Sequence, residues 1–153
     1  MSEEPLALRD LLERVLEYER AVYNFYKLGE TFSTFEDTGF SDTFMLMAEE
    51  ELRHVKTIEE ILKSECPEVS IDYLDALSIS SSVAYRPGNP DDFSDLLLEA
   101  LKMEKYAHEV YMKLSEVLNG SLSQIFRMMA MEELAHAYRI RLIYGEGRWD
   151  REE

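Results

Sequence analysis

Two short segments of the chain carry the same order of potential metal-ligating side chains. AEEELRH spans residues 48–54 and AMEELAH spans residues 130–136. In both, a glutamate is followed three positions later by a histidine: Glu51 and His54, and Glu133 and His136. Residues three positions apart on a helix project from the same side, about one turn apart, so one metal ion can contact both members of a pair. The spacing therefore predicts two pairs of metal ligands, one on each of two helices.

The two segments belong to a longer internal repeat. Two parts of the first half align with two parts of the second half: residues 16–28 with 101–114, and residues 44–54 with 126–136. This alignment places Glu19 on Glu104 and Tyr26 on Tyr111. Because the same residues recur in the same order, the chain is predicted to be a duplicated helical hairpin.

Glu19 and Glu104 occupy positions that the helical period assigns to the core. Glu19 lies in a stripe with Leu12, Leu16, Tyr23 and Tyr26, and Glu104 lies in a stripe with Leu97, Leu101, His108 and Tyr111. Four carboxylates inside a bundle would carry a heavy desolvation penalty. Two divalent cations would remove that penalty, because their charge balances four carboxylates and two neutral imidazoles. Bundle-core sites take this form, with one Glu from each of two helices and Glu-x-x-His from each of the other two.

The sequence therefore predicts a dinuclear metal site with six ligands: Glu19, Glu51, His54, Glu104, Glu133 and His136. The alternative is an acidic bundle whose glutamates face solvent. Two of the three histidines of the chain lie in the repeated pairs, and this recurrence favours the metal site. Carboxylate-rich sites with two imidazoles suit iron and manganese, and zinc can occupy the same ligands.

Other side chains near these stripes have open roles. His108 follows Glu104 by four residues, so it is an extra ligand, a donor to a ligand, or a packed histidine. Tyr26 and Tyr111 are candidate catalytic residues, because a phenol near a metal can hydrogen-bond a ligand or supply an electron; the alternative is core packing. Glutamates that adjoin the ligands are expected to face solvent or to lie behind the ligands: Glu49, Glu50 and Glu132.

The elements that must position these residues are helices. The apolar period and the end signals predict four of them, at about residues 5–31, 41–63, 92–118 and 122–144. Short links make consecutive helices antiparallel neighbours, whereas the connection of about residues 64–91 is long enough to cross the length of a helix. We expect one all-α domain over residues 1–153: two duplicated hairpins joined by one long crossover.

Composition narrows the possible partners. The net charge is −16, and no basic stripe is present that could follow phosphates, so nucleic acid is not expected as a partner. No apolar run approaches the roughly 18 residues of a membrane span, and the start MSEEPLALRD is acidic. A membrane is not expected as a partner either, and the predicted location is cytoplasmic. The single cysteine, Cys66, cannot form an internal disulfide.

The segments EYERAVYNFY, AEEELRH, KMEKYAHEVY and AMEELAH together resemble the rubrerythrin-like branch of the ferritin-like di-iron carboxylate superfamily. The resemblance extends over all four expected helices. It implies a ferritin-like four-helix bundle, two iron ions held by the six residues named above, and a homodimer. It also implies that Glu51 and Glu133 bridge the two irons.

Two departures from the family pattern affect the expected activity. Rubrerythrins carry a rubredoxin domain with paired CxxC motifs that delivers electrons, and Cys66 alone cannot form one. They also have a further glutamate one turn after the ligand on the third helix, where this chain has Ala107. We therefore expect electrons to come from a separate donor.

Three functions remain open from the sequence. The first is an oxidoreductase in which Fe(II) reacts with H₂O₂ or O₂, of the peroxidase or ferroxidase type, for example in peroxide removal. The second is an iron storage or delivery protein without sustained turnover, whose acidic surface attracts cations. The third is a structural bundle in which the metal closes the core.

Overall fold

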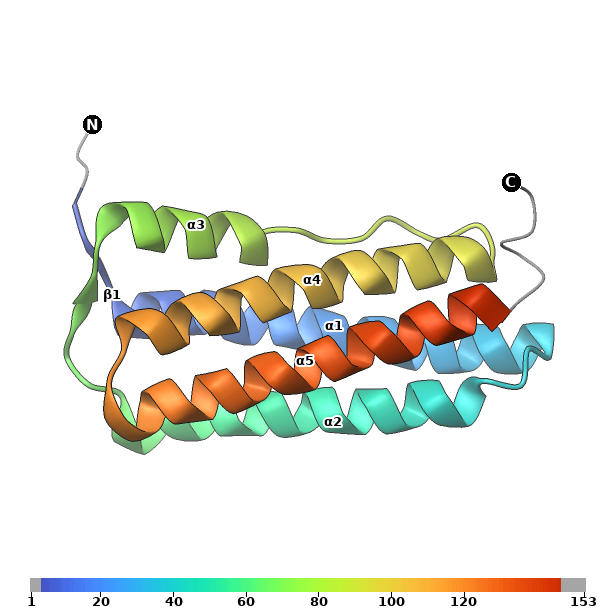
Figure 1. The fold of residues 1–153 in the computed structure, drawn as a ribbon, viewed down its shortest axis with the longest axis horizontal. Helices are drawn as coiled ribbons and strands as arrows, with labels where there is room; N and C mark the ends of the chain where they lie inside the picture. Colours follow the sequence, from blue (N-terminus) through green and yellow to red (C-terminus); the bar gives the residue numbers. More distant parts are fainter. Residues whose placement is uncertain (1–3, 147–153) are drawn as a thin grey trace.

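The computed structural model describes residues 4–146 and confirms an all-α, ferritin-like bundle. Its four long helices lie side by side (Figure 1): α1 (Leu8–Glu36), α2 (Ser41–Glu60), α4 (Phe93–Val117) and α5 (Gly120–Glu146). α1 and α2 form one antiparallel hairpin, and α4 and α5 form the other. The prediction of 1–153 as one domain extends beyond the described residues.

The ends of the long helices differ from the predicted ones by a few residues. α1 begins at Leu8 rather than residue 5, and it continues to Glu36 rather than ending at 31. Near this end the hydroxyls of Thr31 and Thr34 donate to carbonyls four residues back along the helix. The helix stops at Asp37, whose φ of 56° is left-handed.

The crossover contains more structure than the predicted connection of residues 64–91. α2 continues into a π-helical turn, η1 (Ile61–Glu65), and two short strands, β1 (Leu6–Ala7) and β2 (Ser70–Ile71), pair in antiparallel register. A further helix, α3 (Tyr73–Val83), covers part of the bundle before an extended segment leads to the start of α4 at the opposite end (Figure 1). α3 contacts α1 and α4, and its buried side chains are Ala76, Ile79 and Val83.

The core fills the space between the four long helices. At one point α1 and α2 approach so closely that a Cβ on Gly29 would lie 2.7 Å from Cδ1 of Phe44. Phe44 is itself fully buried and packs on the rings of Tyr26 and Phe93. The described part of the chain contains no helix with both the length and the apolarity of a membrane span.

Candidate metal centre

Six ionisable side chains meet in the middle of the bundle, each at most 2% exposed. α1 supplies Glu19 and α4 supplies Glu104. α2 and α5 each supply one Glu-x-x-His pair: Glu51 with His54, and Glu133 with His136. The structure therefore brings together all six residues predicted as metal ligands.

The cluster divides into two overlapping groups, and each group could hold one metal ion. The first consists of Glu19, Glu51, His54 and Glu133, and the second consists of Glu51, Glu104, Glu133 and His136. In each group one oxygen or nitrogen from every residue lies within 4.8 Å of the others. Glu51 and Glu133 belong to both groups, so each is placed to be shared between two ions.

Both imidazoles turn Nδ1 toward the carboxylates. His54 Nδ1 lies 3.3 Å from Oε2 of Glu133 and 3.5 Å from Oε1 of Glu51. His136 Nδ1 lies 2.9 Å from Oε2 of Glu51 and 3.3 Å from Oε2 of Glu104. In each group the imidazole nitrogen and the carboxylate oxygens therefore converge on one small volume.

The opposite nitrogen of each imidazole contacts a glutamate from the other hairpin. His54 Nε2 pairs with Oε1 of Glu132, and His136 Nε2 pairs with Oε1 of Glu50. An Nε2–H that donates to a carboxylate leaves the Nδ1 lone pair free for a metal and fixes the ring orientation. Glu50 and Glu132 therefore lie behind the ligands, the second of the two roles the sequence left open. The sequence contained one signal for this role: Glu50 and Glu132 occur at equivalent positions of the repeat, directly before Glu51 and Glu133.

Two buried tyrosines connect the hairpins at the same level. The Tyr26 hydroxyl of α1 donates to Oε2 of Glu104 on α4, and the Tyr111 hydroxyl of α4 donates to Oε2 of Glu19 on α1. Burial and the neighbouring glutamates raise the pKa of both phenols well above the usual value, so both stay protonated. Each phenol therefore holds one oxygen of a carboxylate in place.

Glu19, Glu51 and Glu133 differ in proton affinity when no ion is present. Burial, together with the charges of Glu19 and Glu104, raises the pKa of Glu51 to about 8. Burial also raises the pKa of Glu133 well above its usual value. Burial acts in the same direction on Glu19, but hydrogen bonds with Glu51 and His54 outweigh it and lower its pKa to about 2. The cluster therefore retains protons that a bound cation would displace.

The donor set fits two divalent cations. One oxygen of each carboxylate is buried and has no hydrogen-bond partner among the described residues: Oε1 of Glu19, Glu51, Glu104 and Glu133. A buried acceptor without a partner costs free energy, and coordination to a cation would remove that cost. These four oxygens and the two Nδ1 atoms form the mixed oxygen and nitrogen set that iron and manganese accept.

Comparison with known families supports the same interpretation. Residues 95–153 match the rubrerythrin family model, which is described as rubrerythrin. Over this region the chain is rubrerythrin-like. The matched region covers most of α4 and all of α5, and it includes Glu104, Glu133 and His136. The searches of curated proteins and of solved structures returned no match.

Two residues near the site, His108 and Ala107, are not placed to ligate a metal. His108 does not belong to either metal-holding group; its Nδ1 lies 2.9 Å from the carbonyl oxygen of Ala130. Among the roles left open for it, the structure therefore favours a packed histidine. Ala107 is buried on the core side of α4 and offers no carboxylate one turn after Glu104.

Proposed function

We propose that this protein is a non-haem di-iron carboxylate oxidoreductase in which Fe(II) reacts with H₂O₂ or O₂. The observation that carries the proposal is the buried pair of overlapping groups, in which each of four carboxylates keeps one unpartnered oxygen. The rubrerythrin match over residues 95–153 supports iron as the metal. The six proposed ligands are those predicted from the repeat: Glu19, Glu51, His54, Glu104, Glu133 and His136.

When bound, two ferrous ions would supply two electrons to the oxidant. The protein would hold both ions through Glu51 and Glu133, which belong to both groups. Tyr26 and Tyr111 would keep Glu104 and Glu19 oriented, and their position beside these carboxylates makes them candidate catalytic residues. The surrounding apolar core would exclude bulk water from the ions.

Sustained turnover needs a source of electrons. A single cysteine, Cys66, cannot form the paired CxxC site of a rubredoxin. We therefore propose an electron donor outside these 153 residues. The alternative function is iron storage or delivery, which the net charge of −16 also favours because it attracts cations.

Anaerobic titration with Fe(II), followed by a pulse of H₂O₂ or O₂, tests the proposal. We expect two irons per chain and a rapid rise in ferric absorbance. Both should be lost in a Glu51→Ala, Glu133→Ala double variant. The matched control is Glu49→Ala with Glu109→Ala, which removes two exposed carboxylates. Failure of the wild type to bind two irons would contradict the di-iron site.

Turnover then separates the two functions. With excess H₂O₂ and a chemical reductant, an oxidoreductase consumes peroxide through many cycles per chain. A storage or delivery protein oxidises its bound iron once and stops. A single cycle in the wild type, with two irons bound, would assign the second function.

A further inference from the structure

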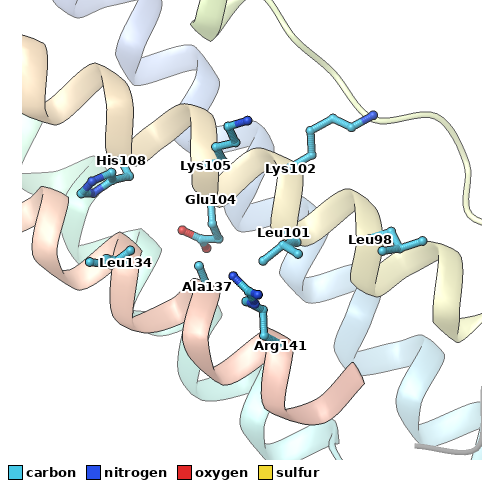
Figure 2. A pocket seen from close by; sticks show the side chains of 9 residues that line it. All are labelled: Leu98, Leu101, Lys102, Glu104, Lys105, His108, Leu134, Ala137 and Arg141. Carbon is cyan, nitrogen blue, oxygen red and sulfur yellow. The ribbon is translucent and has the colours of Figure 1, made fainter. Parts of the chain in front are cut away.

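A pocket of about 390 Å³ opens between α4 and α5, beside the metal centre (Figure 2). Its apolar lining comes from Leu98, Leu101, Leu134 and Ala137. Glu104 also lines it, and Figure 2 shows the carboxylate of this residue in the space between the two helices. Small-molecule sites start at about 300 Å³ and combine an apolar lining with a few polar groups. The size and lining of the pocket fit that description.

Three cations surround this pocket on a strongly acidic protein: Lys102, Lys105 and Arg141. Figure 2 shows Arg141 reaching from α5 toward Glu104, whereas the ammonium ends of Lys102 and Lys105 extend from α4 away from Arg141. Among the side chains that the structure describes, none of the three has an ion-pair partner, although Lys102 lies over the ring of Tyr85. Their charges are therefore available to an anion.

The internal repeat shows how this pocket differs from the equivalent place on the other hairpin. The alignment places Lys105 on Arg20 and Arg141 on Glu59. Arg20 and Glu59 form a 2.6 Å salt bridge that joins α1 to α2. On α4 and α5 the same two positions are both cationic, so they repel each other and cannot make that bridge.

Side chains that line the pocket are smaller than those at the equivalent positions of the first hairpin. Ala137 corresponds to Val55, which is larger and buried in the first hairpin. His108 corresponds to Tyr23 and is also smaller. At these positions the second hairpin therefore lacks the ion pair and has smaller side chains than the first.

We propose that the pocket between α4 and α5 binds a small organic anion, a monocarboxylate with an apolar chain. Its carboxylate pairs with Arg141, and its chain lies on Leu98, Leu101 and Leu134. A bound molecule then lies beside Glu104, at the edge of the metal centre. The proposal does not depend on redox activity or on the identity of the metal.

Octanoate is the probe for this site, and 1-octanol is its neutral counterpart. Both are titrated into ¹⁵N-labelled protein, as purified and after loading with diamagnetic zinc, and followed by NMR. Octanoate should shift amides in residues 98–108 and 134–141, with a Kd on the order of 1 mM for a ligand of this size. Octanol and inorganic phosphate should each bind more weakly, because octanol lacks the negative charge and phosphate lacks the apolar chain.

Arg141→Glu tests the role of the guanidinium directly, because it replaces this cation with the acid that Glu59 supplies on the other hairpin. We expect this variant to bind octanoate at least about tenfold more weakly, equivalent to losing one good ion pair. Arg20→Glu is the matched control: it makes the same change in net charge on the other hairpin and should leave the Kd unchanged. Melting temperatures and zinc content verify that both variants fold and keep the metal centre.

Three results would overturn the proposal: equal binding of octanoate and octanol, equal weakening in both variants, or shifted amides outside α4 and α5. Failure of the metal centre is a separate outcome. It would appear as loss of zinc from the wild type, whereas octanoate binding in protein as purified would persist.

Discussion

The two imidazoles of the cluster are each held on the side away from the proposed ions. Glu132 contacts His54 Nε2, and Glu50 contacts His136 Nε2. Carboxylates in this position orient a ligating histidine and raise its basicity, and their loss lowers metal affinity about 10- to 100-fold. A Glu50→Gln, Glu132→Gln double variant should show a loss in that range, measured by competition with a chelator. Glu49→Gln, which changes an exposed neighbour, is the control; equal affinities in both proteins would contradict this role.

The buried tyrosines give a second prediction, concerning stability. Tyr26→Phe removes the donor to Glu104, and Tyr111→Phe removes the donor to Glu19. Each change removes a hydrogen bond to a buried carboxylate oxygen, so each should lower the free energy of unfolding of the metal-free protein by about 1–3 kcal/mol. Urea denaturation measures the loss. Tyr138→Phe, at an exposed position, should have no effect, and a similar loss there would refute the assignment.

The raised pKa of Glu51 predicts how the stability of the metal-free protein depends on pH. Folding raises this pKa from 4.5 to about 8, so the protonated carboxyl favours the folded state. This stabilisation is complete below pH 4.5 and is lost as the pH rises through 8. The lowered pKa of Glu19 acts in the opposite sense, but between about pH 2 and 4.5.

The melting temperature of the metal-free protein should therefore fall between pH 6 and pH 9. Glu51→Gln, which cannot ionise, should make this fall less steep, whereas Glu133, whose pKa is also raised, still contributes to it. Added Zn²⁺ should stabilise the wild type more at pH 8 than at pH 6, because protons compete with the cation for the carboxylates. A melting temperature that rises with pH in the metal-free wild type would show the sign to be wrong.

The repeat made the six-residue cluster predictable, because one pattern of spacing occurs twice at core positions. The contacts of Glu50, Glu132 and the tyrosines were not predictable in the same way. They join residues 78 to 92 positions apart, on helices whose relative rotation no local pattern specifies. Spacing indicates which side of a helix a residue occupies, but not which partner it meets across the bundle.

At the scale of elements, Gly29 allows α1 and α2 to pack closely. An added Cβ would lie 2.7 Å from Cδ1 and 3.2 Å from Cγ of Phe44, a ring held between Tyr26 and Phe93. Gly29→Ala should therefore lower the free energy of unfolding by about 1–3 kcal/mol through overpacking, despite the better helix propensity of alanine. Thermal unfolding measures this change.

A compensating change separates overpacking from other causes. Phe44→Leu removes ring atoms at the point of contact, so the double variant should recover part of the stability that Gly29→Ala loses. Gly88→Ala, where the added Cβ meets nothing within 4 Å, is the matched control. A stable Gly29→Ala protein would show that the two helices can separate without cost.

The elements themselves were predictable to different degrees. The four long helices follow from apolar period and end signals, and Asp92 caps α4 by accepting from the amide of Asp95. α3 was not predicted, because its eleven residues include four serines and bury only three side chains. Packing against α1 and α4 stabilises it, and that contact is not encoded within the segment.

At the scale of the whole molecule, the two hairpins share their interior and differ at their surfaces. Both supply one Glu, one Glu-x-x-His pair and one tyrosine to the centre. Outside the centre, only the first has the Arg20–Glu59 bridge between its helices, and the second has cations at those positions. The metal site depends on both halves equally, whereas contacts with other molecules can use one half alone.

The outer faces of α5 and α2 also differ, and this difference predicts how two copies of the chain associate. The outer face of α5 exposes an apolar stripe at spacings of three and four residues: Met128, Met131, Ala135, Tyr138 and Leu142. The repeat aligns these with a largely charged face of α2: Leu46, Glu49, Arg53, Lys56 and Glu60. Alternating spacings of three and four are those of a seam between two helices, and an exposed apolar patch of this kind marks an interface.

A second copy of the chain suits this stripe, because a two-fold axis brings the same apolar residues of both copies together. We therefore expect a homodimer that pairs α5 with α5. A Met131→Lys, Tyr138→Glu double variant should be monomeric in sedimentation equilibrium while binding the same amount of metal as the wild type. Leu74→Glu with Leu77→Lys, which alters exposed leucines of α3, should remain dimeric. A monomeric wild type, or a dimer that survives the changes on α5, would show that the stripe does not join two copies.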